Sequence, residues 1–176
     1  SEGKSTVGRL TAPQPLSENH VTENFDCGNE FLNEWLKKFA LINSRANAAK
    51  TFVVCDHHKA IGYYSLAMGS VDYELSTSRI KKGLARHPIP VVVLARLGVD
   101  LGYQKKRIGV SLLKDAFLRT LLISEHIGAR AVFVNAKDDN AKKFYEKHGF
   151  KPLPSDTLKL LILIKDIKYT LENPLI

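Results

Sequence analysis

The chain is short of cysteine, and it has no apolar run long enough to cross a membrane. Its two cysteines, Cys27 and Cys55, stand far apart among 176 residues and form no CxxC pair. We therefore expect two small buried thiols without a catalytic role, in a reducing compartment such as the cytoplasm. No apolar stretch approaches the roughly 20 residues of a membrane span, and the initial SEGKSTVGRL lacks the apolar core of a signal peptide. The sequence thus predicts a cytoplasmic protein with no membrane association.

Several widespread catalytic motifs are also absent. The sequence contains no GxSxG, Walker loop, GxGxxG, HExxH or zinc-ligand spacing, which argues against the hydrolases, nucleotidases, dinucleotide-binding enzymes and zinc proteases that carry them. His57 and His58 are adjacent and favour a turn over a metal site. Asp138 and Asp139 are more simply the start of a helix than a catalytic pair of carboxylates. No metal is therefore predicted.

Acidic residues are outnumbered by basic ones. The chain has 18 aspartates and glutamates against 26 lysines and arginines, which gives a formal net charge of +8. This balance favours an anionic partner such as nucleic acid, an anionic cofactor, an acidic protein or a membrane surface. Because the basic residues are spread along the chain, we expect a basic face on a folded domain. A solvated surface without a dedicated partner is the alternative.

The length suits one domain with a sizeable core. We expect a single domain over residues 9–176, preceded by a disordered or cloning-derived segment over residues 1–8. Apolar periodicity and turn residues predict alternating helices and strands. In chain order these are a helix over 29–43, strands over 51–55 and 61–71, a long basic segment over 74–90, a buried strand over 90–100, a helix over 109–126 capped by Gly128, a strand over 129–136, a short helix within 138–150 and a final strand over 158–167. This order predicts an α/β fold with a mixed central β-sheet flanked by helices.

A basic turn joins the buried strand to the helix that follows it. The turn reads QKKRIGV, from Gln104 to Val110, and its single glycine is Gly109. The free N–H groups of a helix's first turn favour an anion, and the lysines add positive charge. The turn therefore suits a phosphate group, although phosphate-binding loops usually contain more glycine.

A second segment, DDNAKKFYEKHGF, follows a strand that ends at Asn135. Together with QKKRIGV, it resembles the GNAT family of acetyl-CoA-dependent N-acyltransferases, whose loop reads Q/R-x-x-G-x-G/A. The stretches FDCGNEFLNEWLKKFA and PIPVVVLARLGVD are similar, more narrowly, to the TacT-type toxins of bacterial toxin–antitoxin pairs. Those enzymes acetylate the amino acid on charged tRNA.

The resemblance implies a GNAT fold, acetyl-CoA as the cofactor and a set of site residues. Tyr145 would be the catalytic general acid toward the leaving thiolate; the alternative is a packing aromatic beside Phe144. Backbone N–H groups at Leu97–Val99 would hold the pantetheine and polarise the thioester carbonyl. Asn140 would contact the cofactor, unless helix capping alone explains it. The implied cofactor-binding residues are Leu97, Gly98, Val99, Gln104, Lys105, Lys106, Arg107, Ile108, Gly109, Val110, Asn140 and Phe144.

The acceptor implied by the resemblance is aminoacyl-tRNA. A free α-amino group has a pKa of about 8, so much of it is neutral at physiological pH and no strong protein base is required. Lysines and arginines would contact the tRNA phosphates. Arg96, inside the apolar strand, would reach the acceptor or pair with a carboxylate. The tRNA-binding candidates are Arg79, Lys81, Lys82, Arg86, Arg96, Lys37, Lys38 and Arg45.

The toxin resemblance also implies partners. These are a ribbon-helix-helix antitoxin, operator DNA bound through that antitoxin, and a second copy of the chain in a homodimer. Two other functions stay open: a GNAT enzyme acting on a small amine or a protein N-terminus, and a non-catalytic acyl-CoA-fold or nucleic-acid-binding module.

The loop departs from the family pattern. Arg107 replaces the middle glycine, and Lys105 stands where many relatives also have glycine. Glycine lets the backbone approach phosphate closely and adopt positive φ. Arg107 would therefore obstruct or strain the loop, or else add a charged contact to phosphate. We expect impairment, whether the arginine is natural or engineered.

Overall fold

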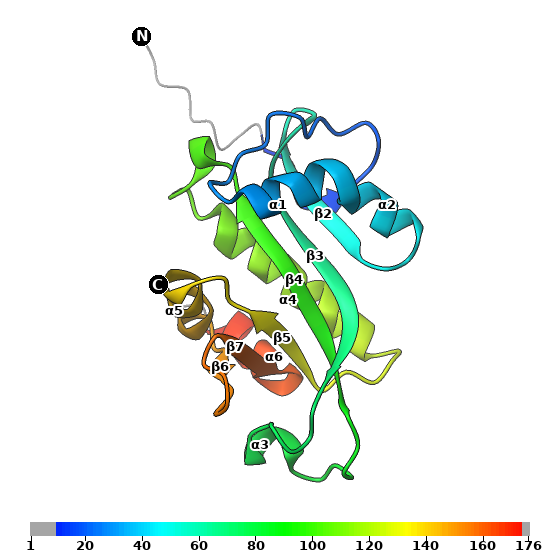
Figure 1. The fold of residues 1–176 in the computed structure, drawn as a ribbon, viewed down its shortest axis with the longest axis vertical. Helices are drawn as coiled ribbons and strands as arrows, with labels where there is room; N and C mark the ends of the chain where they lie inside the picture. The colour runs from blue at the N-terminus through cyan, green and yellow to red at the C-terminus, as the bar shows by residue number, and fades with distance from the viewer. Residues whose placement is uncertain (1–9, 174–176) are drawn as a thin grey trace. The chain divides into compact units, whose positions relative to one another are not determined.

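The computed structural model describes residues 10–173, so the predicted leading segment 1–8 lies outside the described residues. Its strands form a seven-stranded mixed sheet in the order β1-β2-β3-β4-β5-β7-β6, flanked by helices (Figure 1). The α/β fold with a mixed central sheet is thus confirmed. The strands are β1 Gln14–Pro15, β2 Lys50–Asp56, β3 Lys59–Val71, β4 Ile89–Val99, β5 Ala131–Asn135, β6 Lys151–Pro152 and β7 Lys159–Leu163.

The helices alternate with these strands as the sequence predicts. They are α1 Glu30–Glu34, η2 Trp35–Phe39, α2 Ala40–Arg45, α3 Ser78–Lys81, η3 Leu101–Tyr103, α4 Ile108–Ser124, α5 Asp139–Lys147 and α6 Ile164–Glu172. The sequence does not predict three of them, α3, η3 and α6. Within residues 10–173, no helix has the length and apolarity needed to cross a membrane.

The chain divides into two compact units. The first comprises the chain up to Leu66 together with Arg96–Ala116, and the second comprises Ala67–Ala95 with the chain from Phe117 onward. Cys27 and Cys55 are both buried in the first unit, and they form no disulfide among the described residues.

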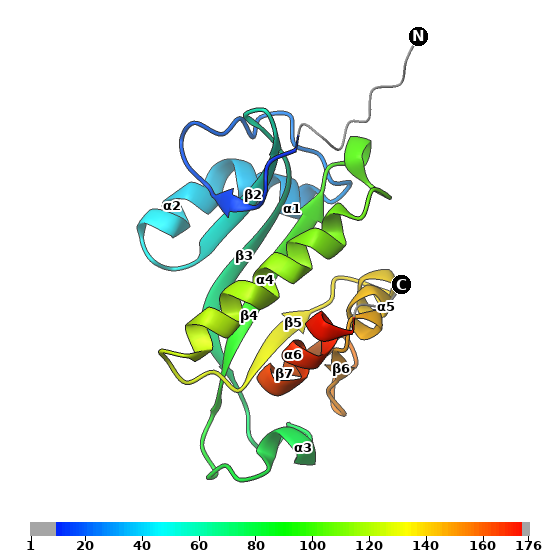
Figure 2. The ribbon, with the colours of Figure 1, turned by 180° about the vertical axis from the view of Figure 1, so that it is seen from behind.

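In the first unit, β2 and β3 form an antiparallel hairpin whose polar turn contains His57 at a φ of +56°. The predicted turn is therefore confirmed. The helical segment α1-η2-α2 covers one face of this hairpin (Figure 1), and the first half of α4 covers the other (Figure 2). Gly62 on β3 permits the close approach of α4, because a Cβ there would lie 3.2 Å from Leu112 and 3.3 Å from Ile108.

In the second unit, β4 pairs in parallel with β5 at Val91–Val93, and β7 pairs antiparallel with both β5 and β6. A buried apolar cluster fills its interior. Its members are Ile80, Ile89, Val91, Ala131, Leu153, Leu161 and Leu163.

The basic segment 74–90 contains a short helix that the sequence analysis did not predict. This helix is α3, whose Ile80 is buried. Arg79 forms a two-pronged ion pair with Asp166 of α6, with an Nη2–Oδ1 distance of 2.8 Å. Arg130 donates to the backbone carbonyls of Ile80 at 3.2 Å and Lys82 at 3.0 Å. These partners are distant in sequence, so no local pattern reveals them.

Three predicted boundaries are wrong. The final strand over 158–167 ends at Leu163, because the residues that follow, IKDIKYTLE, have helical spacing and bury Ile167 in α6. The helix predicted to reach 126 ends at Ser124, so Gly128 does not cap it. The helix predicted over 29–43 runs to Arg45 and contains the π-helical turn η2.

Candidate functional site

The predicted phosphate loop lies in the first unit, between η3 and α4. Gln104 closes it, since its side-chain amide donates to the carbonyl of Val99 at 2.9 Å and to that of Cys27 at 3.2 Å. Asp100 caps η3 by accepting from Gly102 N–H at 2.9 Å. The structure therefore brings the end of β4 and the loop together, as the sequence predicts.

Lys105 and Arg107 both have a φ of +62°. This is the left-handed region, which glycine enters freely and in which a Cβ atom crowds the following carbonyl, at roughly 1–2 kcal/mol for each residue. Arg107 stands at the middle glycine of the family pattern, and Lys105 stands where many relatives also have glycine. The loop thus keeps a backbone shape suited to glycine while carrying two long basic side chains.

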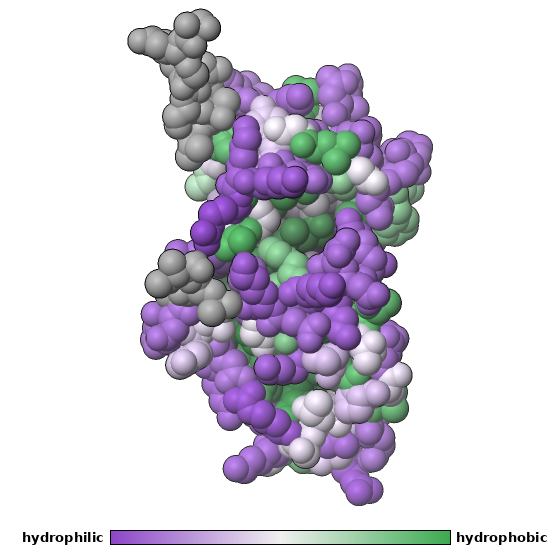
Figure 3. All heavy atoms as spheres, turned by 90° about the vertical axis from the view of Figure 1, so that its left-hand side faces the viewer, coloured by the Kyte–Doolittle hydropathy of each residue, from purple (hydrophilic) through white to green (hydrophobic). Residues whose placement is uncertain are grey.

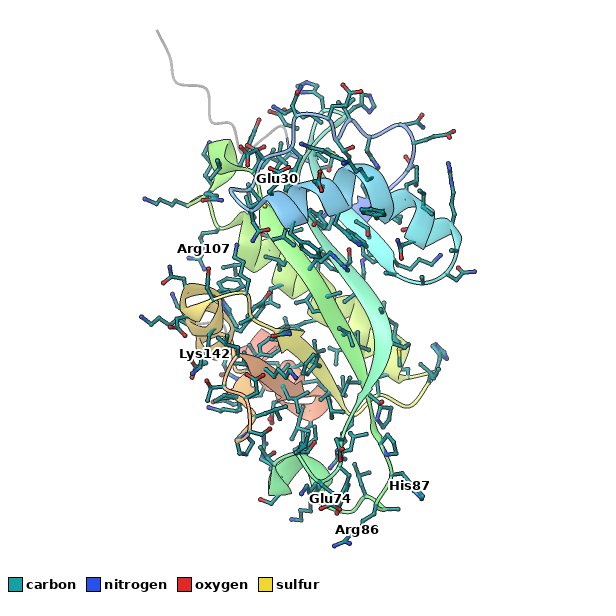
Figure 4. All side chains as sticks on the ribbon, viewed as in Figure 1. Glu30, Glu74, Arg86, His87, Arg107 and Lys142 are labelled. Carbon is teal, nitrogen blue, oxygen red and sulfur yellow. The ribbon has the colours of Figure 1, made fainter. Side chains whose placement is uncertain are left out.

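The loop presents positive charge at the start of a long helix. Gln104, Lys105, Lys106 and Arg107 are all exposed, and Figure 4 shows Arg107 beside the start of α4. In the first turn of any α-helix the N–H groups have no partner within the helix. Here they belong to Ile108, Gly109 and Val110. The helix dipole, the N–H groups and the basic side chains together favour a phosphate ligand.

The strand end Leu97–Val99 is tightly packed. A Cβ at Gly98 would lie 3.3 Å from the sulfur of Cys27. Gly98 is buried, whereas Leu97 and Val99 are half-buried. The proposed pantetheine contacts of this segment remain predictions.

The predicted catalytic segment lies in the second unit, on α5. The side chain of Asp138 accepts from Ala141 N–H at 2.8 Å and is the helix cap. Asn140 is therefore not the cap, and capping does not account for it. At the other end, Gly149 terminates the helix with a φ of +97°, and His148 binds the carbonyl of Phe144 through Nδ1 at 2.8 Å.

Tyr145 is buried, and its ring packs edge-on against Phe144 and Phe150 with centroids 5.3 Å away in each case. Burial raises the pKa of its hydroxyl above the ordinary value, so the proton is retained at physiological pH. Within residues 10–173 this hydroxyl has no hydrogen-bond partner, whereas the buried Tyr63 and Tyr64 donate to the Leu32 carbonyl and to Asp115. The Tyr145 ring therefore packs in the core, while its hydroxyl donates to no described residue.

Arg96 makes contacts that the sequence did not reveal. Its guanidinium lies over the indole of Trp35, 3.9 Å from the ring centroid, and 5.8 Å from the centroid of Phe31. Among the described residues it has no carboxylate partner, so the predicted ion pair is not found. Sequence spacing could not bring residues 35 and 96 together, because a helix packed on a sheet makes this contact.

The other predicted tRNA contacts are distributed over both units, and several have acidic neighbours. In the first unit, Lys38 pairs with Glu34 at 2.9 Å and Arg45 with Glu18 at 3.2 Å. Exposed ion pairs of this kind contribute little to stability. Lys37 is exposed beside them.

In the second unit, Arg79 is held in an ion pair by Asp166. The other predicted tRNA-binding residues of this unit make longer contacts or are exposed. Arg86 lies 3.9 Å from Glu74 near the tip of the hairpin between β3 and β4 (Figure 4), beside a cavity of about 360 Å³ lined by residues 70–74 and 86–88. Lys81 stacks over the ring of Tyr73 at 5.0 Å, and Lys82 is exposed. Hydrophilic residues dominate the molecular face in Figure 3.

No group of His, Cys, Asp and Glu suited to a metal ion occurs in the part of the chain that the structure describes. The predicted cofactor and catalytic residues lie on the loop and the strand end of the first unit and, separately, on α5 of the second.

Comparison with known proteins gives a consistent result. The family model described as acetyltransferase (GNAT) domain matches residues 47–152. A tRNA-acetylating toxin of Mycobacterium tuberculosis is 35% identical over 158 residues, which cover 90% of this chain and 95% of the relative.

Solved structures of relatives have the same fold. The structure of AtaT complexed with acetyl-methionyl-tRNAfMet matches with a TM-score of 0.84 and 27% identity, over 92% of this chain and 99% of that one. A tyrosine-to-phenylalanine mutant of AtaT, bound to the C-terminus of the antitoxin AtaR and acetyl-CoA, matches with a TM-score of 0.78 and 25% identity, over 93% of this chain and 98% of that one.

Proposed function

Because the chain belongs to the GNAT acetyltransferase family, we propose that it transfers the acetyl group of acetyl-CoA to the α-amino group of aminoacyl-tRNA. The observation that carries this proposal is the 35% identity, over nine-tenths of the chain, to a tRNA-acetylating toxin. Acetylation of the amino acid removes its nucleophilic amine, so such an enzyme blocks translation and acts as a toxin.

Acetyl-CoA supplies an activated thioester, and the residues of the first unit suit its phosphates. The exposed cations Lys105 and Lys106, with the first N–H groups of α4, form the pyrophosphate site, and Arg107 lies in the same loop, where it replaces a glycine and weakens that site. Gln104 holds this loop against Val99, which keeps it in register with the strand end. The backbone of Leu97–Val99 holds the pantetheine and polarises the acyl carbonyl. Asn140 and Phe144 of α5 add contacts to the cofactor.

Tyr145 serves as the general acid that returns a proton to the departing sulfur. Two features support this role: its position in FYEKHGF and a hydroxyl proton that no described residue accepts. A strong protein base is unnecessary, because an α-amino group near physiological pH is partly neutral.

The basic residues that lack strong partners position the tRNA. Lys37 and Lys82 are exposed, and Lys38, Arg45 and Arg86 have only exposed acidic neighbours. Lys81, which lies over the ring of Tyr73, adds a further cation, and Arg96 contacts the acceptor end. Arg79 contributes indirectly, because its pair with Asp166 fixes the segment that carries Lys81 and Lys82.

The remaining proposals concern assembly. We propose a cytoplasmic homodimer in which residues 9–176 form one catalytic domain. A ribbon-helix-helix antitoxin neutralises the toxin and carries it to operator DNA. The antitoxin complex of AtaT, a structural relative, supports an antitoxin as a partner.

The proposal is tested by following labelled acetyl groups. Purified protein with radiolabelled acetyl-CoA is offered charged bulk tRNA, the same tRNA after deacylation, polyamines and peptides in parallel. We expect label only on charged tRNA. Label on a polyamine or on peptide N-termini, with none on charged tRNA, would establish the alternative small-amine or N-terminal acetyltransferase instead.

A further inference from the structure

The first unit holds a cation without a polar partner. The Nε atom of Arg96 is inaccessible to solvent and has no hydrogen-bond partner within residues 10–173. None of the described carboxylates pairs with this guanidinium. Burial lowers the pKa of Arg96 from its ordinary value. An unpaired, half-buried guanidinium is unfavourable in isolation, and its position therefore suits a ligand that supplies acceptor oxygens.

The stacking on Trp35 orients this cation. The indole covers one face of the guanidinium at 3.9 Å, and a stacked guanidinium directs its N–H groups sideways, in its own plane. That fork matches two oxygens of a planar or tetrahedral anion. Trp35 thus stabilises the charge by a cation–π contact and leaves the outer Nη donors, unlike the inaccessible Nε, free for a ligand.

Trp35 itself is held from two sides. Its ring stacks on Tyr63 with centroids 6.2 Å apart and planes within 9°. The Tyr63 hydroxyl donates to the carbonyl of Leu32 at 2.8 Å, which ties the same helix to β3. Trp35 is also the first residue of the π-helical turn η2, and such turns occur frequently at functional sites. The arrangement is therefore a rigid platform for Arg96.

An exposed aromatic ring lies next to this platform. Phe31 is 67% exposed, which is unusual for phenylalanine, and its ring centroid is 5.8 Å from the Arg96 guanidinium. Figure 4 places its neighbour Glu30 at the start of α1. An exposed ring beside a free guanidinium is the combination that binds single-stranded nucleotides, since bases stack on the ring and phosphates accept from the cation.

We propose that Phe31 and Arg96, supported by Trp35, form a binding site for one unpaired nucleotide. The base stacks on Phe31, and the adjoining phosphate accepts hydrogen bonds from Arg96. The identity of this nucleotide rests on the proposed function. It is the unpaired 3′-terminal residue of aminoacyl-tRNA, which carries the amino acid. The site would then distinguish an aminoacyl nucleotide from a free amino acid.

The test is binding of a fluorescein-labelled RNA tetranucleotide, ACCA, followed by fluorescence anisotropy. We expect Phe31→Ala and Arg96→Met each to weaken binding by roughly tenfold. Arg96→Met should also reduce the slope of binding against salt concentration, because it removes a phosphate contact, whereas Phe31→Ala should not. Phe39→Ala is the matched control, since Phe39 is 49% exposed on the same helical segment. It should bind like the wild type.

A second pair of measurements distinguishes this proposal from a purely structural role of the stack and from a contact with the amino acid. Circular dichroism and acetyl-CoA affinity should stay unchanged in all variants. If Arg96→Met does not fold, Arg96→Lys is used in its place, and Phe31→Leu is used in place of Phe31→Ala. Wild-type affinity for ACCA in the folded variants would overturn the proposal and make the stack purely structural. Equal increases of KM for charged tRNA and for an amino acid methyl ester would also overturn it, because the pair would then contact the amino acid.

Failure of the proposed function gives a different result. In that case the wild type acetylates no charged tRNA, while ACCA binding and its loss in the two variants are unaffected.

Discussion

At the scale of single residues, Arg107 carries the clearest conflict between conformation and chemistry. Its φ of +62° favours glycine. Arg107→Gly should therefore increase the free energy of unfolding by roughly 1 kcal/mol or slightly less, tighten acetyl-CoA binding and raise activity. Denaturant unfolding and calorimetry measure the first two effects. The matched control is Lys106→Gly, because Lys106 has no positive φ and glycine gains nothing there. Weaker acetyl-CoA binding by Arg107→Gly would show instead that the arginine is a phosphate ligand.

Tyr145 is the second residue-scale test, because its ring packs while its hydroxyl is uncommitted. Tyr145→Phe keeps the aromatic contacts with Phe144 and Phe150 and removes only the proton donor. We expect kcat to fall about 100-fold, as for loss of a general acid, with acetyl-CoA affinity and thermal stability nearly unchanged. A large loss of affinity or stability with normal kcat would assign Tyr145 a structural role.

At the scale of elements, the end of α5 depends on Gly149. Its φ is +97°, and a Cβ there would lie 3.1 Å from both Ile162 and Thr170. Gly149→Ala should destabilise the protein by more than 1 kcal/mol, measured by denaturant unfolding. Gly128→Ala is the control, since nothing lies within 4 Å of a Cβ at Gly128. Equal effects of the two substitutions would contradict the argument.

The link between α3 and α6 should depend on pH. The hydrogen bond from Arg79 lowers the pKa of Asp166 below its ordinary value of 3.8. A carboxylate whose folded pKa is depressed stabilises the fold above its unfolded pKa, and this contribution disappears as the pH falls through the folded value. A double-mutant cycle with Arg79→Met and Asp166→Asn should show favourable coupling at pH 7 and progressively none below pH 3.8. Coupling that persists in acid would refute the ion-pair account.

At the scale of the whole molecule, the sequence predicts the alternating elements and the sheet well. Buried runs such as PVVVLARLGVD and the turn at Gly149 act locally, so they are visible in the sequence. The helix α6, the π-helical turn and the two-pronged bond of Arg79 are not visible, because each depends on residues brought together by folding.

The same distinction applies to the site. The loop and the tyrosine segment follow from motif spacing, whereas the Arg96 contact with Trp35 needs a helix packed on a strand 61 positions away in sequence, the difference between 96 and 35. The conformations of Lys105 and Arg107 likewise emerge only from the backbone.

The most direct test of the central claim identifies the product. Charged tRNA is incubated with the protein and acetyl-CoA, digested with nuclease, and the terminal aminoacyl-adenosine is analysed by tandem mass spectrometry. Acetylation of the α-amino group of the amino acid, lost in Tyr145→Phe, is the predicted result. Unmodified aminoacyl-adenosine, or an acetyl group on the nucleoside, would contradict the account.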